Sequence, residues 1–352
     1  MRYLTFGRRT GLRVSEYCLG TGNFGTGWGA GADSAESRRM FDRFADAGGT
    51  LLDTADSYQR DTESEHMLGV FLAHDRDHFV VATKYTNGAG AKPRVSETGN
   101  SRKNMIRSLE GSLRRLRTDY VDIYWAHFPD RMTPTEEIVR AFDDLVQAGK
   151  ILHGALSNFP AWRVARAATI AELRGWSPVA GIQVEYSLAE RTADRELVPM
   201  AEAMGLAATF YHPLAGGLLT GKYRGHAEGR MTIRARGYHT EDTEQRTAVV
   251  TALLAVAAEI GLPPAQVAMA WLRERAARAS TALIPIIGPR TVDQLDDYLS
   301  ALDVTLSGDQ FARLSDISSA AMGVPHDAAD AQQPALAGGL PDRTVPPPIP
   351  VA

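Results

Sequence analysis

Four polar side chains stand near the ends of short apolar runs that indicate β-strands. Asp53 and Tyr58 belong to the segment TLLDTADSY, and Lys84 belongs to FVVATKY. His127 ends the segment VDIYWAH. In a barrel of parallel strands the carboxyl ends of all strands open on one face, where the chemistry takes place. We therefore expect these four side chains to meet at that face.

A Tyr surrounded by Lys, Asp and His has the groups needed to protonate a carbonyl oxygen. Hydride addition to a ketone or aldehyde leaves negative charge on oxygen, and an acid must supply a proton. Free Tyr titrates near pH ~10, and a neighbouring ammonium lowers that pKa. An Asp keeps the Lys charged, and a His can orient the substrate oxygen by donating a hydrogen bond to it.

Each residue taken alone also has an ordinary structural interpretation. A Tyr after a strand usually packs, an Asp often caps a turn, a Lys is usually a solvated charge, and a His often makes a structural hydrogen bond. All four, however, follow the second, third and fourth predicted strands. That coincidence favours a catalytic group.

The elements that must position this group alternate along the chain. We predict strands at 17–21, 50–54, 79–83, 120–125, 151–156, 180–184, 206–211 and 282–287. Helical patterns lie at 34–47, 62–74, 99–116, 135–148, 160–174, 192–204 and 291–302. The strands are continuous apolar runs, as expected when both faces of a sheet are buried. Eight such strands separated by helices predict an α/β fold, a (β/α)8 TIM barrel.

Several segments add to the bare barrel. Residues 2–14 predict a hairpin that plugs the amino-terminal mouth, and residues 221–246 form a long polar loop after the seventh strand. Two further helices, near 243–260 and 264–278, precede the eighth strand. We assign residues 1–323 to one barrel domain. The tail 324–352 is rich in Pro and Ala, so we expect little regular structure there.

The bulk composition excludes several functional classes. The 352 residues are 44% hydrophobic and 23% charged, with a net charge of -4, which predicts no nucleic-acid or membrane partner. Cys18 is the only cysteine, so an intrachain disulfide is impossible. The amino terminus has no signal-peptide pattern, and we expect a cytoplasmic protein. No H-x-H pair accompanies His127, so we predict no metal site.

Ordered segments over most of the chain resemble the aldo-keto reductase family. The segments that carry the resemblance are LGTGNFG (19–25), GGTLLDTADSY (48–58), ATKY (82–85), SLRRLRTDYVDIYWAH (112–127), LSNF (156–159), IQVEYS (182–187), YHPLAGGLLTGKY (211–223) and IPIIGPRTVDQL (284–295). The resemblance implies a barrel, a nicotinamide cofactor and a catalytic tetrad. Tyr58 then corresponds to the general acid, Lys84 and Asp53 to the partners that lower its pKa, and His127 to the substrate-orienting residue. The branch of the family that reduces C=C bonds has Glu at this last position, so His127 favours carbonyl reduction.

The same resemblance implies where NADPH binds. GTGNFG lacks the context of a dinucleotide-binding fingerprint, and we interpret it as a βα loop. The positions that bind the carboxamide are matched by Ser157, Asn158 and Gln183. The aromatic that stacks on the nicotinamide is matched by Tyr211. The diphosphate clamp is matched by Gly216, Gly217 and Lys222. Arg290 and Thr291 match a 2′-phosphate site, which favours NADPH over NADH. The remaining residues implied in cofactor binding are Gly22, Asn23, Asp53, His212, Pro213, Leu214, Gly288, Gln294 and Asp297. Two positions depart from the family pattern: His212 replaces Ser, and Tyr298 replaces Asn.

Loop aromatics are the candidates for the substrate pocket. They are Phe24, Trp28, Tyr85 and Phe128, with Trp162 as a further candidate, and Arg60, Arg131 and Arg191 are nearby charges. The pattern is similar to bacterial members that include deoxysugar ketoreductases, so the first hypothesis for the small-molecule carbonyl substrate is a nucleotide-linked keto-deoxysugar. The alternatives are a general aldehyde reductase and an NADPH-binding regulatory subunit similar to potassium-channel β subunits. The sequence leaves the oligomeric state open.

Overall fold

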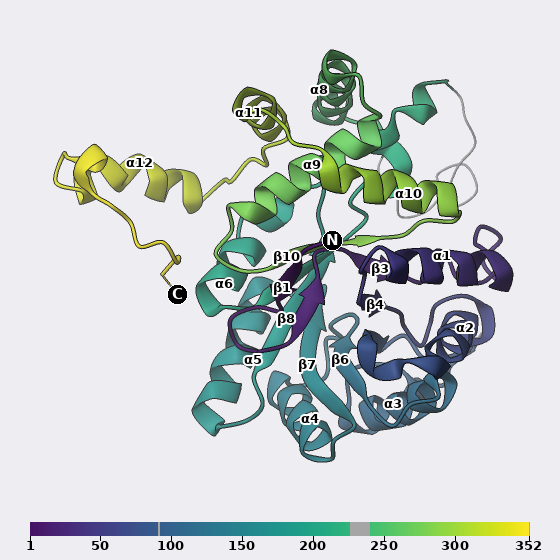
Figure 1. The fold of residues 1–352 in the computed structure, drawn as a ribbon. Helices are drawn as coiled ribbons and strands as arrows, with labels where there is room; N and C mark the ends of the chain where they lie inside the picture. The colour runs from purple at the N-terminus through teal and green to yellow at the C-terminus, as the bar shows by residue number, and fades with distance from the viewer. Residues whose placement is uncertain (91, 226–239, 352) are drawn as a thin grey trace.

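A closed barrel of eight parallel strands forms the centre of the molecule (Figure 1). The computed structural model describes residues 1–90, 92–225 and 240–351. Around the barrel the strands run in the order β10-β3-β4-β5-β6-β7-β8-β9. The last strand, β10, pairs with the first barrel strand, β3, and closes the barrel. The strands are β3 (Cys18–Gly20), β4 (Leu51–Asp53), β5 (Val80–Tyr85), β6 (Val121–Ala126), β7 (Ile151–Ser157), β8 (Val179–Glu185), β9 (Ala207–Tyr211) and β10 (Leu283–Ile287). The predicted barrel is confirmed.

Helices cover the outside of the barrel and bury one face each. They are α1 (Ser34–Asp46), α2 (Glu63–Phe71), α3 (Arg102–Leu116), α4 (Thr135–Gln147), α5 (Ala161–Arg174), α6 (Leu197–Met204) and α10 (Val292–Ser300). In α4 the buried positions Ile138, Phe142 and Leu145 recur at helical spacing, and this stripe packs against β7. The helices thus follow from the amphipathic patterns in the sequence.

The hairpin at the amino terminus closes one end of the barrel, as predicted. Its strands β1 (Tyr3–Thr5) and β2 (Arg13–Ser15) pair antiparallel. Phe6 is fully buried and meets Trp125 of β6 edge to face, with ring centroids 6.4 Å apart. The turn after it needs Gly7, because its φ is 73° and a Cβ there would lie 2.7 Å from the Gly205 carbonyl oxygen. The plug leaves the carboxyl end of the barrel for the site.

Two helices follow β9, close to their predicted positions. They are α8 (Glu244–Ile260) and α9 (Pro264–Ala277). Residues 226–239 of the predicted long loop lie outside the described residues. A further helix that the sequence analysis missed, α11 (Gly308–Ile317), packs on α8. Its start is marked by a reciprocal cap, in which Ser307 and Gln310 each accept the other's backbone N–H.

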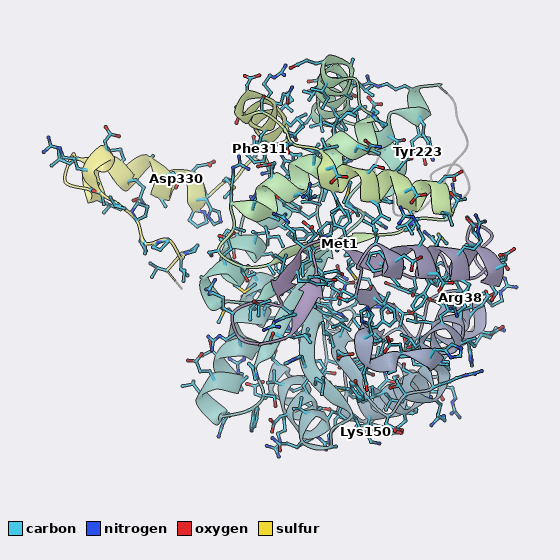
Figure 2. All side chains as sticks on the ribbon, viewed as in Figure 1. Met1, Arg38, Lys150, Tyr223, Phe311 and Asp330 are labelled. Atoms are coloured by element: carbon cyan, nitrogen blue, oxygen red, sulfur yellow. The ribbon has the colours of Figure 1, made fainter. Side chains whose placement is uncertain are left out.

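The tail contradicts our expectation of little regular structure. Residues His326–Leu336 form the helix α12, whose side chains are almost all exposed. It lies apart from the barrel, with Asp330 at a distance from the body (Figure 2). The sequence HDAADAQQPAL is rich in Ala and Gln, which favour helix, and we gave too much weight to the prolines around it. The chain is anchored before α12, where Arg195 donates to the Met322 carbonyl.

We also tested whether any element could cross a membrane. Within the described ranges, no single helix has the necessary length and hydropathy. Only α8 and α9 counted together pass, and these two helices are bent by 100°.

Candidate active site

The Lys84 ammonium is the centre of a buried polar cluster. It donates to Asp53 Oδ2 at 2.5 Å, to the Thr54 carbonyl at 2.7 Å and to the Tyr58 hydroxyl at 2.8 Å. Lys84 is fully buried, and Asp53 is 3% exposed. An ammonium has three N–H groups, and here each has an acceptor. The cluster is therefore a fixed arrangement rather than a chance meeting of mobile side chains.

Strand register brings these side chains together. Asp53 is the last residue of β4 and pairs with Ala82 of β5, two residues before Lys84. Alternate residues of a strand share a face, so Lys84 points to the same side of the barrel wall as Ala82. The chain then turns back, with the Tyr58 N–H donating to the Ala55 carbonyl at 3.2 Å. This turn places the phenol beside the ammonium.

His127 lies on the next strand end, after β6. Its backbone N–H donates to the Tyr85 carbonyl, and its ring lies edge to face with Tyr58 at a centroid distance of 5.9 Å. Burial, with a smaller effect of the Lys84 ammonium, holds the pKa of His127 well below its usual value. The imidazole is therefore neutral at pH 7, and one ring nitrogen carries a hydrogen that can be donated to a substrate oxygen.

Charge and burial oppose each other at Tyr58. Burial raises the pKa of Tyr58, and the Lys84 ammonium, which lowers it as expected, does not offset burial. The net direction differs from our expectation of a lowered pKa, since the sequence could not show how completely the phenol is desolvated. Burial also lowers the pKa of Lys84, but Asp53 and Tyr58 outweigh it, so that pKa is raised. Lys84 is thus a cation at neutral pH.

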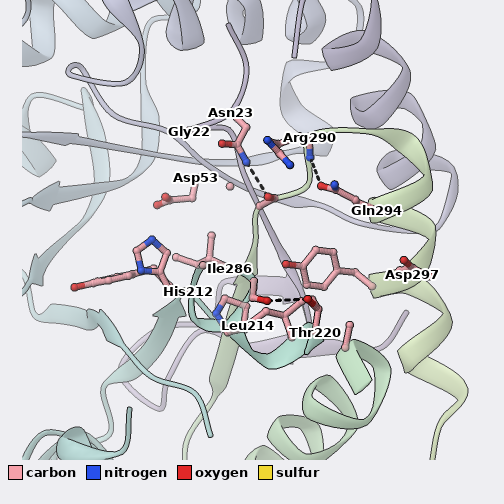
Figure 3. Close-up of a pocket in the computed structure, with 18 of the residues that line it drawn as sticks. Gly22, Asn23, Asp53, His212, Leu214, Thr220, Ile286, Arg290, Gln294 and Asp297 are labelled. Atoms are coloured by element: carbon pink, nitrogen blue, oxygen red, sulfur yellow. Dashed lines mark hydrogen bonds between the residues drawn. The ribbon is translucent and has the colours of Figure 1, made fainter. Parts of the chain in front are cut away.

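A cavity of about 440 Å³ opens beside this cluster (Figure 3). Asp53 and Tyr58 lie at its wall, whereas Lys84 and His127 are buried next to Tyr58 and do not line it. Fifteen of the residues implied in cofactor binding line it: Gly22, Asn23, Asp53, Gln183, Tyr211, His212, Pro213, Leu214, Gly216, Gly217, Lys222, Gly288, Arg290, Gln294 and Asp297. Segments from β3 to α10 thus converge on one space.

The far end of the cavity is built from loops and a helix start. Gln294 accepts a hydrogen bond from the Arg290 N–H at 2.9 Å (Figure 3). Thr291 caps α10 by accepting from the Gln294 N–H. Asn23 donates to the Gly288 carbonyl and ties this loop to the loop after β3. Lys222 and Arg290 add two cations to the lining. Positive charge together with a helix amino terminus suits a phosphate-bearing ligand.

Ser157 and Asn158 do not line the cavity. Ser157 is fully buried, and Asn158 has a left-handed backbone with a φ of 61°. The Asn158 side chain donates to the His127 carbonyl at 3.0 Å and accepts from the Tyr211 hydroxyl at 2.8 Å. In this structure Asn158 connects the cavity aromatic Tyr211 to the strand end that carries His127.

Gln183 bonds to the cluster from the opposite side of the barrel. Its amide donates to Asp53 Oδ1 at 3.0 Å, while Lys84 binds the other carboxylate oxygen. Both oxygens of the carboxylate are therefore held. Gln183 also lines the cavity, so it joins the buried cluster to the ligand space.

Two of the four expected substrate-pocket residues are in the core instead. Phe24 is fully buried and packs edge to face on Phe71. Tyr85 is fully buried and stacks on Tyr124. It follows Lys84 in the same strand, so it must face the opposite side of the barrel wall. These two expectations are wrong.

The other two aromatic candidates lie at the site. Trp28 lines the cavity and meets Tyr58 edge to face at 6.0 Å. Phe128 is 42% exposed and stacks on His127 at 4.6 Å. Trp162, by contrast, is 67% exposed at the start of α5. Trp28 and Phe128 therefore flank the Tyr58 and His127 pair.

Some lining residues were not among our candidates. They are Gly20, Thr220, Ala265 and Ile286. Gly20, Thr220 and Ile286 lie within segments that carry the family resemblance, so their position offered a signal. Ala265 is the second residue of α9, and nothing in its local sequence distinguishes it.

Both departures from the family pattern face the cavity. His212 Nδ1 lies 3.2 Å from Glu185 Oε1, and the backbone of His212 is left-handed with a φ of 55°. Tyr298 lines the opposite end, near Gln294. Within the described ranges, no three His, Cys, Asp or Glu side chains are grouped to hold a metal ion.

Comparison with known proteins identifies the family of the chain. The sequence model of the Aldo/keto reductase family matches residues 16–319. The chain belongs to the aldo/keto reductase family. This reductase is therefore an oxidoreductase of a family that generally works with NAD(P)H on carbonyl groups. The resemblance inferred from the motifs is confirmed.

Characterised and uncharacterised relatives match the reductase over most of their length. An uncharacterized oxidoreductase of Bacillus subtilis is 36% identical, covering 90% of this chain and 96% of its own. The aryl-alcohol dehydrogenase (NADP(+)) of Phanerodontia chrysosporium is 35% identical, covering 90% and 86%. A norsolorinic acid reductase of Emericella nidulans is 33% identical, covering 90% and 81%.

The cavity fits a dinucleotide. Its one end is the buried cluster, and its other end carries cations and the start of α10. Glycines keep the wall between them open: a Cβ on Gly217 would lie 3.3 Å from the Lys222 side chain. The wall residues thus leave backbone N–H groups and cations accessible to a diphosphate.

Proposed function

We propose that the protein reduces an aldehyde or ketone to an alcohol with NADPH, and that Tyr58 is the proton donor. The observation that carries the proposal is the hydrogen bond from the Lys84 ammonium to the Tyr58 oxygen at the cavity wall. Since Lys84 donates in that bond, the phenolic hydrogen is left to point into the cavity. Bound NADPH supplies the hydride.

The residues around Tyr58 have separate roles in this proposal. Tyr58 gives its proton to the carbonyl oxygen as negative charge develops there. The Lys84 cation stabilises the tyrosinate that remains, and Asp53 holds Lys84 in place. Neutral His127 donates a hydrogen bond to the same substrate oxygen and orients it.

A preference for NADPH over NADH rests on Arg290. This guanidinium lies at the cavity end where α10 begins. A 2′-phosphate on the adenosine ribose would receive a charge-assisted hydrogen bond there, and NADH has no such group. Lys222 also lines the cavity and would serve the diphosphate of both cofactors.

For the substrate we propose an aryl aldehyde or ketone. Trp28 and Phe128 flank the proposed donor pair and offer aromatic faces to a planar ring. Two relatives carry the names aryl-alcohol dehydrogenase and norsolorinic acid reductase. A nucleotide-linked keto-deoxysugar is the second candidate, favoured by the exposed Arg60 and Arg131, which follow Tyr58 and Phe128 in the chain and suit a diphosphate.

The test is the loss of NADPH absorbance with an aryl aldehyde, a simple ketone and a keto-sugar nucleotide, each repeated with NADH. We expect turnover with NADPH, fastest with the aryl aldehyde. Faster turnover of the keto-sugar nucleotide would overturn the aryl assignment but keep the reductase. Equal rates with the aryl aldehyde and with an aliphatic aldehyde added to the panel would indicate a general aldehyde reductase. Tight NADPH binding without turnover of any member would favour a regulatory subunit.

A further inference from the structure

Asp56 is a buried carboxyl group that the proposed reaction does not use. It is fully buried, and neither carboxyl oxygen has a hydrogen-bond partner within the described part of the chain. Buried carboxylates in proteins are normally paired or hydrogen-bonded, because an isolated buried charge is very costly. An acid in this setting keeps its proton.

The backbone of Asp56 lies in the turn that carries the proposed proton donor. Its N–H donates to the Lys84 carbonyl at 3.1 Å, and the Thr54 carbonyl accepts from the Lys84 ammonium at 2.7 Å. The turn therefore holds Lys84 from both ends, by its backbone and by its side chain. Two residues later the same turn delivers Tyr58 to the ammonium.

The cations around Asp56 are committed to other groups. Arg115 of α3 donates to Glu65 at 2.6 Å, and Arg107 of the same helix pairs with Glu97 at 3.5 Å. Lys84 of β5 has given its three N–H groups to the cluster described above. Glu65 of α2, itself fully buried, adds a like charge.

The electrostatic effects on Asp56 therefore favour its neutral form. Burial, and after it the like charge of Glu65, raise the pKa of Asp56 to about 8, although Arg115, Arg107 and Lys84 act in the opposite direction. From β6, Tyr124 is the remaining titratable neighbour; it is fully buried, and its hydroxyl donates to the Met105 carbonyl. Among the described residues, these charged and titratable neighbours thus offer no new partner to the Asp56 anion.

We propose that Asp56 is a positioning residue: its neutral form keeps the turn from Asp53 to Tyr58 in place, and its ionisation at alkaline pH displaces the Tyr58 hydroxyl from Lys84. An anion without a partner is relieved only by admitting water or moving the turn. Either change disturbs the contacts that hold Lys84 and Tyr58 together. Asp56 then sets the alkaline limit of activity without touching substrate or cofactor, and this consequence for turnover rests on the proposed function.

The sign of the effect on stability follows from linkage. In the unfolded chain Asp56 ionises near pH ~3.9, whereas the folded chain keeps the proton up to a pH of about 8. Between these values the folded state binds the additional proton, so stability falls as pH rises and levels off above the folded pKa.

The closing experiment compares the wild type with Asp56→Asn. We expect the alkaline limb of kcat near pH 8 in the wild type to move upward by about one pH unit or more in Asp56→Asn. The equilibrium constant of unfolding is then measured with urea, without cofactor, between pH 6 and 8. For each pH unit, this constant should rise about tenfold more in the wild type than in the variant. Asp143→Asn is the matched control, a buried but hydrogen-bonded carboxyl on α4, and it should leave both pH dependences unchanged.

A second variant covers the case in which Asp56→Asn fails to fold. Glu65→Gln removes the like charge and leaves Arg115 positive, so it should move the alkaline limb to lower pH, the opposite direction. A folded Asp56→Asn with the wild-type limb and unfolding slope would overturn the proposal, as would an unmoved limb in Glu65→Gln. Absence of turnover with every substrate would count against the proposed function alone, because the unfolding slopes still decide whether Asp56 titrates as proposed.

Discussion

The two ends of the cavity are built in different ways. One end is formed by strand ends and a tight turn, which carry Asp53, Lys84 and Tyr58. The Lys84 ammonium donates three hydrogen bonds there. At the other end, Lys222 and Arg290 extend from loops and a helix start. A reacting atom must be held to within a fraction of an ångström, whereas a phosphate needs only charge and N–H groups nearby. The barrel therefore fixes the reacting groups at one end, and the loops place positively charged side chains at the other.

The strongest test of this comparison is to remove the proposed proton donor. Tyr58→Phe should lower kcat by about 10²–10⁴-fold, the usual effect of a general acid, and leave NADPH affinity nearly unchanged. Cofactor binding is measured by titration, and turnover by loss of NADPH absorbance. Near-normal turnover would remove Tyr58 from the proton-donor role. A parallel loss of NADPH affinity would show that the two ends are not separable.

Removing the ammonium should affect folding as well as turnover. Lys84→Met leaves Asp53 buried with its charge uncompensated on one side, and breaking a buried pair costs about 3–5 kcal/mol. The free energy of unfolding, measured by urea denaturation, should fall by that order. Lys222→Met at the opposite end is the matched control and should change stability little, because its side chain is only partly buried. An equal loss in the free energy of unfolding of both variants would show that the two ends of the cavity do not differ in rigidity.

Changes at the loop end should alter cofactor choice alone. Arg290→Ala should raise the Michaelis constant for NADPH by roughly 10–100-fold, the equivalent of one lost hydrogen bond to a charged group. The constant for NADH should change far less, and kcat at saturating cofactor should persist. If both constants rise together, Arg290 does not read the 2′-phosphate.

The smallest expected effect is that kcat shows no acidic limb near the usual pKa of a histidine. The pKa of His127 is lowered, so the neutral ring persists as pH falls through its usual value of about 6.5. Activity should be lost only at pH values well below that, as the ring finally takes up a proton. The measurement is kcat against pH, with His127→Gln for comparison. An acidic limb near 6.5 that this variant abolishes would show that His127 is not held neutral.

Much of this arrangement was predictable from single residues. The apolar runs before Asp53, Lys84 and His127 gave the barrel strands and the clustering of their polar ends. What failed was the direction of individual side chains. Tyr85 was assigned to the pocket although its neighbour Lys84 already faced the barrel interior, and the two-residue period of a strand excludes both on one side.

Other parts of the site had no signature in the sequence. The third acceptor of Lys84 is the backbone carbonyl of Thr54, and any residue type would supply it. The bond from Gln183 to Asp53 joins residues 130 positions apart and depends on closure of the barrel. The helix at 326–336 was missed because the prolines near it outweighed its Ala and Gln content in our interpretation.

The bonding of Lys84 also protects the protein from its own chemistry. An amine condenses with an aldehyde to form an imine only through an unprotonated nitrogen that the aldehyde can reach. Lys84 is fully buried, its pKa is raised, and all three of its N–H groups are held by acceptors. The amine bonded to the proposed proton donor is thus kept from acting as a nucleophile. A reactive aldehyde bound next to Tyr58 would find a hydrogen-bond donor there, and the Lys84 nitrogen behind that donor could not trap it.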